Sequence, residues 1–192
     1  GDRVAYVAAD ADGPRLVVVD LHATDDGIAA GTERVVAAGR VAEDGTVLET
    51  GPVAGRGTGG GAYDWLPDGT GLLYAGTDGA LWIVDAERDA TDDTAAGATA
   101  PRRIVASTPA PDGPPAQAPA VSPDGRHVVF TRDTRDVVIA PVDGPGEVLV
   151  VTMPDGPDFA MDPVWHPDGD AVEFQGWSVP AMPWDHAVRY VA

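Results

Sequence analysis

Short apolar runs alternate with polar turns along the chain, and one type of turn recurs. Pro-Asp-Gly stands at 67–69, 123–125 and 167–169. After each of these copies, at the same offset, come an apolar residue, one spacer residue and an aromatic residue. The three pairs are Leu72 and Tyr74, Val128 and Phe130, and Val172 and Phe174. Val4 and Tyr6 have the same spacing, and they make a fourth pair if Gly1 is the last residue of a turn.

This spacing has a physical meaning in a β-strand. Side chains two residues apart point to the same face of a strand, so each pair predicts one aliphatic and one aromatic group in the same core layer. In the turn, proline presets φ, aspartate bonds its own backbone, and glycine adopts the positive φ that other residues resist. Four copies of one strand predict a repeat architecture.

Other apolar runs fall at regular positions around each copy. A strand is expected before each turn, at 62–66, 118–121 and 162–165. Further strands are expected after the copies, at 15–20, 33–38, 81–85, 102–107, 137–142, 147–152 and 188–192. The turns are 56 and 44 residues apart. About four short strands in such a unit match the size of one β-propeller blade.

We therefore predict an all-β fold, a β-propeller of about four blades of four-stranded antiparallel sheet. The first and last blades are incomplete, so the chain 1–192 is expected to be one propeller segment, an arc of a larger ring with apolar end faces. The blades are expected at about 1–53, 62–107, 118–152 and 162–192. A β-sandwich also explains short strands, but not the returning column of residues. A four-bladed ring that closes on itself is a further alternative.

The stretches between these strands read as loops, because none has a convincing helical periodicity. Residues 21–31, 86–100 and 108–117 are rich in Ala, Asp, Thr, Gly and Pro, and we predict loops there. The stretch 41–49 predicts an additional hairpin whose turn is Asp44-Gly45.

Composition and charge narrow the range of partners. The chain has 192 residues and no cysteine, which excludes disulfides and thiolate chemistry. Its formal net charge of −19 disfavours nucleic acid and anionic membranes as partners, because both are polyanions. No apolar run approaches the length of a membrane span. We expect no nucleic-acid or membrane partner and a cytoplasmic location.

The side chains that usually carry chemistry are few and badly placed for it. Ser107, Ser122 and Ser178 lack the glycine-flanked strand-to-helix turn of a hydrolase nucleophile. The histidines form no zinc-type pair; they are His22, His127, His166 and His186.

Two further motifs are equally weak. The glycine-rich stretch 55–61 has the spacing of a dinucleotide loop, but a strand follows it where a helix is needed. Residues 10–13 resemble the start of a calcium loop without its remaining ligands. We predict no catalytic residue, no metal site and no cofactor in this chain.

One stretch, from Pro163 to His186, concentrates the rare large side chains. The turns and the apolar-x-aromatic strands resemble the repeats of TolB-like propellers and of the prolyl oligopeptidase family. The segment 165–192 is more specific, because it resembles a propeller segment of the bacterial dipeptidyl aminopeptidase/acylaminoacyl-peptidase-like members of that family. In those members a tryptophan is followed by Pro-x-Met-Pro-Trp-Asp. The matching positions are Trp177, Pro180, Met182, Pro183, Trp184 and Asp185.

The resemblance implies a propeller that covers an α/β-hydrolase domain and restricts which peptides reach its Ser-Asp-His triad. This chain has no triad candidate. The resemblance therefore implies the non-catalytic propeller portion of a serine peptidase, which gates and selects peptide substrates for a hydrolase domain of the same polypeptide. One alternative is a TolB-like protein-binding propeller without catalytic activity. Another is an enzyme that uses the propeller channel, but of the aligned positions 64, 120 and 164 only Asp64 offers a carboxylate.

The candidate functional residues lie in the proline-rich connection, where the prolines constrain the backbone. We expect Trp177, Met182 and Trp184 to bury a large area there. In one interpretation the connection only fills its own blade. In the other it faces substrate or the hydrolase domain, with Trp177, Met182, Trp184 and Asp185 as the contact residues.

Overall fold

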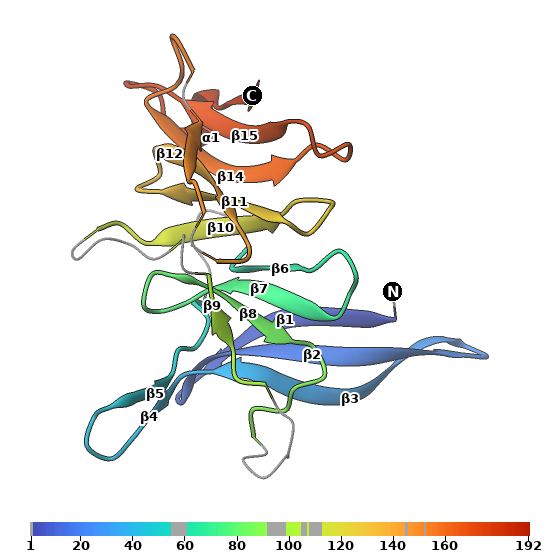
Figure 1. Ribbon diagram of the computed structural model, residues 1–192. Helices are drawn as coiled ribbons and strands as arrows, with labels where there is room; N and C mark the ends of the chain where they lie inside the picture. The colour runs from blue at the N-terminus through green and yellow to red at the C-terminus, as the bar shows by residue number, and fades with distance from the viewer. Residues whose placement is uncertain are drawn as a thin grey trace.

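Antiparallel sheets, stacked one on the next, make up the molecule (Figure 1). The computed structural model describes residues 2–54, 61–91, 99–104, 107, 113–144, 146–151 and 153–192, except for the side chain of Asp10. The described elements are β1 (Arg3–Asp10), β2 (Gly13–Thr24), β3 (Gly27–Ala38), β4 (Arg40–Val41), β5 (Val47–Glu49), β6 (Tyr63–Trp65), β7 (Gly71–Ala75), β8 (Leu81–Asp85), β9 (Arg102–Arg103), β10 (Ala116–Val121), β11 (His127–Arg132), β12 (Asp136–Pro141), β13 (Leu149–Val151), β14 (Phe159–Trp165), β15 (Val172–Trp177), α1 (Pro183–His186) and β16 (Val188–Val191).

The sheets correspond to four propeller blades. Blade 1 is β1-β2-β3, blade 2 is β6-β7-β8-β9, blade 3 is β10-β11-β12-β13 and blade 4 is β14-β15-β16. Every strand pair within a blade is antiparallel. Blade 1 has no strand on the inner side of β1, and blade 4 has none beyond β16. This arrangement confirms the predicted all-β propeller arc.

Each blade packs against the next through the recurring apolar-x-aromatic pair. Leu72 and Tyr74 of blade 2 lie in one buried cluster with Leu16 and Val18 of blade 1. The same contact is made by Val128 and Phe130 on blade 2 and by Val172 and Phe174 on blade 3. One face of each blade therefore receives the pair of the following blade, and the pairs are the core of the stack.

The first copy of the pair is the exception. Val4 and Tyr6 point to the outer side of blade 1, where they stay 44% and 39% exposed. The prediction that they enter a core layer is wrong for this chain, because no described blade lies on that side of β1. Buried side chains of this size contribute roughly 1.5–3 kcal/mol each, which this copy does not gain.

The Pro-Asp-Gly turns have one geometry in blades 2, 3 and 4. In each turn the glycine N–H donates to the carbonyl three residues earlier, as from Gly69 to Leu66 at 2.9 Å. The glycines have φ of 72°, 74° and 77°, which is why glycine stands there. The turns also stack, because a β-carbon on Gly169 would lie 3.6 Å from Cδ of Pro123.

The strand directions define two faces of the arc. Strands β7, β11 and β15 each begin after a Pro-Asp-Gly turn, so all these turns lie on one face, here called the turn face (Figure 1). The opposite face, where the same strands end, is here called the loop face. It carries the connection 178–187 that follows β15.

Two of the sequence-based assignments need correction. Residues 21–31 are not a loop, because β2 and β3 pair from Leu21 and Ala30 outward to a turn before Gly27. Antiparallel backbone pairing holds this hairpin together although alanine and glycine are poor strand formers. The predicted strand 102–107 is also too long: β9 ends at Arg103, and Ile104 is buried in the core.

The additional hairpin predicted at 41–49 is confirmed as β4 and β5. Gly45 has φ of 87°, and the N–H of Thr46 donates to Oδ1 of Asp44 at 2.9 Å. Parts of the predicted loops 86–100 and 108–117, and most of the glycine-rich stretch 55–61, lie outside the described residues. Among the described residues, no helix is both long and apolar enough to cross a membrane.

The packing of the stack makes a testable difference between two copies of the same repeat position. Phe130→Ala empties a fully buried site between blades 2 and 3, so we expect it to lower the free energy of unfolding by about 3–5 kcal/mol. Tyr6→Ala, at the matching position of blade 1, is expected to cost about 1 kcal/mol or less. Urea unfolding followed by circular dichroism measures both, and equal losses would contradict the stacking scheme.

Candidate functional site

The connection after β15 has a rigid base. Trp177, the last residue of β15, is buried, and its ring stacks on Phe159 with centroids 5.3 Å apart and planes at 17°. Phe159 is the first residue of β14, and it pairs with Trp177 across the two strands. This aromatic pair fixes the point where the chain leaves the sheet.

Two polar contacts extend the base by one step. The backbone N–H of Asp158 donates to Oγ of Ser178 at 3.1 Å, and the backbone N–H of Val179 donates to the Asp158 carboxylate at 3.0 Å. These reciprocal hydrogen bonds join the residues that precede β14 to those that follow β15. Sequence reasoning missed both anchors, because Asp158 and Ser178 are 20 residues apart and carry no local motif.

The tip of the connection is one helical turn with exposed apolar side chains. In α1, the N–H groups of Asp185 and His186 donate to the carbonyl of Met182 at 2.9 and 3.1 Å. Trp184 is 71% exposed and Met182 42% exposed, and Asp185 is exposed as well. The expectation that Met182 and Trp184 are buried is wrong, because the connection rises off the sheet after Val179. Only Trp177 of the predicted residues packs into the blade.

The inner strands contribute a carboxylate at Asp64, and its contacts are structural. One oxygen accepts the N–H of Trp65 at 2.9 Å, and the other accepts the N–H of Val121, in blade 3, at 2.8 Å. Burial raises the pKa of Asp64 above the usual aspartate value, against the effect of these two hydrogen bonds. Because both oxygens are engaged by backbone, Asp64 joins blades 2 and 3 and is poorly placed to exchange protons with a ligand.

A hollow of about 350 Å³ lies beside Asp64 on the inner side of the arc. The strands β6, β10 and β14 line it, largely with proline, alanine and valine. Ala118 and Asp162 occupy matching positions in β10 and β14, and both have positive φ, 47° and 52°. Each marks an irregularity in the pairing of its strand, which bends the inner strands toward the axis.

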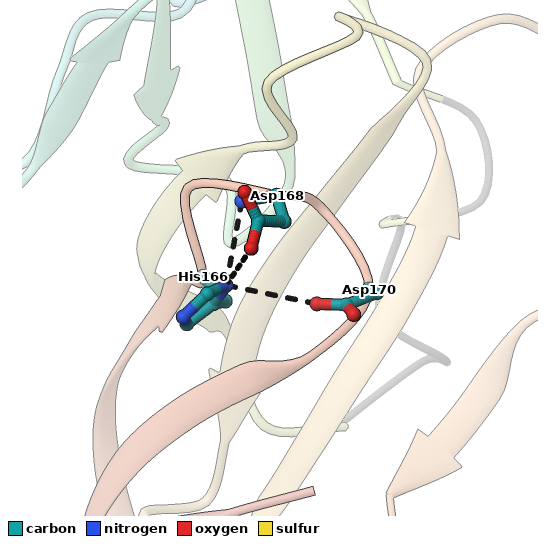
Figure 2. Close-up of side chains that lie close together, drawn as sticks. All are labelled: His166, Asp168 and Asp170. Atoms are coloured by element: carbon teal, nitrogen blue, oxygen red, sulfur yellow. Dashed lines mark hydrogen bonds and ion pairs between the residues drawn. The ribbon is translucent and has the colours of Figure 1, made fainter.

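One histidine and two aspartates meet in the turn of blade 4 (Figure 2). Nδ1 of His166 lies 3.4 Å from the Asp168 carboxylate and 3.6 Å from that of Asp170, and it accepts the backbone N–H of Asp168 at 3.3 Å. Sequence spacing gave no sign of this group. All three residues sit on one exposed turn, and the matching residues of blade 2, Leu66 and Thr70, could not repeat it.

The serine hydroxyls have partners other than an imidazole. Oγ of Ser107 donates to the carbonyl of Ile104 at 2.7 Å. Oγ of Ser122 donates to the Asp124 carboxylate at 2.6 Å and accepts the backbone N–H of His127. These bonds give the serines roles in turns, and among the described residues we find no serine–histidine pair of the kind that activates a nucleophile.

Comparison with solved structures identifies the architecture. TolB from Acinetobacter baumannii superposes with a TM-score of 0.58 at 15% identity, over 99% of this chain and 38% of that one. The fold is that of a TolB-like β-propeller. A TolB-like protein from Agrobacterium tumefaciens gives a TM-score of 0.52 at 16% identity, over 91% of this chain and 61% of that one.

This chain therefore spans less than two thirds of either TolB-like structure. No protein-family model matches the sequence, and neither does any curated protein. At 15% and 16% identity the likeness shows the fold alone.

The two tryptophans of the connection are expected to behave oppositely on truncation. Trp177→Ala removes the buried partner of Phe159 and is expected to cost about 3–5 kcal/mol of stability. Trp184→Ala removes an exposed side chain and is expected to change stability by about 0.5 kcal/mol or less. Chemical unfolding of the two variants measures the difference. A large loss in Trp184→Ala would mean that the tip is part of the core.

Asp64 makes a pH-dependent prediction. Its pKa is raised on folding, so the stability it contributes is complete below the unfolded-state pKa and is lost as pH rises through the folded-state pKa. Asp64→Asn cannot ionise, so its free energy of unfolding should rise relative to the parent protein between about pH 4 and pH 7. Unfolding of both proteins across this range measures the difference, and a constant difference would contradict the assignment.

Proposed function

We propose that this chain is a non-catalytic propeller segment that binds a folded protein surface through the tip of the connection 178–187. The observation that carries the proposal is the contrast between a fixed base and an exposed tip. Trp184 stands in water on a backbone that Trp177, Ser178 and Asp158 hold in place. Tryptophan is enriched among the residues that dominate binding energy, and a preformed loop loses little entropy on binding.

The partner we propose is an α/β-hydrolase domain of the same polypeptide. The resemblance of Trp177, Pro180, Met182 and Trp184 to the prolyl oligopeptidase family pattern supports this choice. In this role the propeller restricts peptide access to a triad that another domain supplies. Peptide substrates are then selected by the propeller and cleaved elsewhere.

A TolB-like protein-binding propeller is the second candidate, since the two TolB-like superpositions fit the arc equally well without a hydrolase. The two functions differ in what the coding sequence holds. A hydrolase domain with a G-x-S-x-x-G nucleophile turn after position 192, followed by Asp and His, supports the peptidase role. A coding sequence without one favours the TolB-like role and removes the proposed partner.

The proposal predicts a functional loss without a folding loss. In the full-length polypeptide, Trp184→Ala should lower kcat/KM for peptide cleavage by about tenfold while the melting temperature stays unchanged. Ile28→Ala is the matched control, because Ile28 is 76% exposed at the end of the β2–β3 hairpin on the turn face. Equal activity of the two variants and the parent would overturn the proposed role of Trp184.

A further inference from the structure

The hairpin β4–β5 is a second apolar projection of the chain. It leaves the stack between blades 1 and 2 (Figure 1). Val41, Val47 and Leu48 are 62%, 64% and 60% exposed. Val41 and Val47 are directly paired across the two strands, and the pairing is irregular at Leu48. A short two-stranded hairpin gains little stability by itself, so three exposed aliphatic side chains on it need a reason.

The root of this hairpin is tied to the core by a buried ion pair. The guanidinium of Arg88 donates to both carboxylate oxygens of Glu49, at 2.8 and 2.6 Å, and also to the carbonyl of Val36 at 2.7 Å. The side chains of Arg88 and Glu49 are buried. Bidentate pairing of this kind fixes orientation, because the planar fork fits a carboxylate in one geometry.

Backbone contacts reinforce the root. The hydroxyl of Tyr74 donates to the carbonyl of Thr50 at 2.9 Å in the buried layer between blades 1 and 2. Gly39 and Gly51 cross so closely that a β-carbon on Gly51 would lie 2.4 Å from the Gly39 nitrogen. The hairpin is therefore held at its base while its tip stays apolar and exposed, the same design as the connection that carries Trp184.

The hairpin and Trp184 belong to the same face of the arc. Strand β3 is antiparallel to β2, which is antiparallel to β1, so β3 ends where β1 ends. The hairpin follows β3, and it therefore projects from the loop face, as the connection 178–187 does (Figure 1). The long β2–β3 hairpin, with Ile28, projects from the turn face instead.

Charge defines what such a face can bind. Glu43 and Asp44 border the apolar residues of the hairpin, and Asp158 and Asp185 border those of the connection. The chain has no lysine and a net charge of −19. A second copy would bring like charges together, whereas a partner with arginine or lysine around an apolar centre is attracted.

We propose that the β4–β5 hairpin is a second docking element of the loop face, and that it contacts the same partner as Trp184. The partner surface is apolar at its centre and basic at its rim. An interface with an apolar core and a charged rim is the usual form of specific protein association. This inference rests on the proposed function, since it extends the contact made by Trp184.

Site-specific photo-crosslinking tests the inference in the full-length polypeptide. The probe is p-benzoylphenylalanine, placed in separate proteins at positions 47, 184 and 28, with crosslinked peptides mapped by mass spectrometry. We expect positions 47 and 184 to crosslink to one partner domain, at apolar segments flanked by arginine or lysine, and position 28 not to reach it. Unchanged melting temperatures show that each protein is folded.

The other outcomes separate the two proposals. Crosslinks from 184 but not from 47 would overturn this inference and leave the proposed function intact. Crosslinks from 47 to a second copy of the chain, or to a surface different from that reached by 184, would also overturn it. If neither 47 nor 184 crosslinks to a partner, both proposals fail.

Discussion

The stacking of one blade on the next is the contact on which everything else depends. A single three- or four-stranded sheet cannot cover its own apolar side chains, so each blade is stable only when the next one brings its apolar-x-aromatic pair against it. Leu72 with Tyr74, Val128 with Phe130 and Val172 with Phe174 do this in turn. The Pro-Asp-Gly turn sets the start of each of these strands, and so it aligns the pairs from blade to blade.

A stack of this kind sends binding and recognition to its edges. Strand interiors are occupied by packing, and even the inner carboxylate of Asp64 is engaged by the N–H groups of Trp65 and Val121. What differs between blades is the connections on the loop face. Blade 2 turns back after β7 through the short segment 76–80, whereas blade 4 inserts ten residues, 178–187, at the same place. An inserted connection with an anchored base and an exposed tryptophan is where a partner can be recognised.

The repeat was accessible from sequence because strand periodicity and turn chemistry are local. The combination of turn and following pair mattered more than the tripeptide. Pro154-Asp155-Gly156 has the same three residues, but there Asp155 has the positive φ, 58°, and no blade begins. What sequence could not give were properties set by distant residues. Trp177 and Trp184 are seven positions apart in one aromatic-rich run, yet only Trp177 meets a partner, Phe159, supplied by another strand.

The anchoring of the hairpin follows the same rule. Asp44-Gly45 predicted its turn, but nothing local to residues 41–49 shows that Glu49 meets Arg88 in the core. The long β2–β3 hairpin was missed for a related reason, since its alanine-rich strands are held by backbone pairing and not by an apolar pattern. Local patterns thus predicted the blades, while the two docking elements needed the three-dimensional structure.

Hydroxyl-radical footprinting tests the central claim most directly. The oxidation rate of Trp184 would be compared between this chain alone and the full-length polypeptide, with buried Trp177 as the internal reference. The account predicts rapid oxidation of Trp184 in the isolated chain and strong protection in the full-length protein, with Trp177 slow in both. Equal oxidation of Trp184 in the two proteins would contradict a docking role for the loop face.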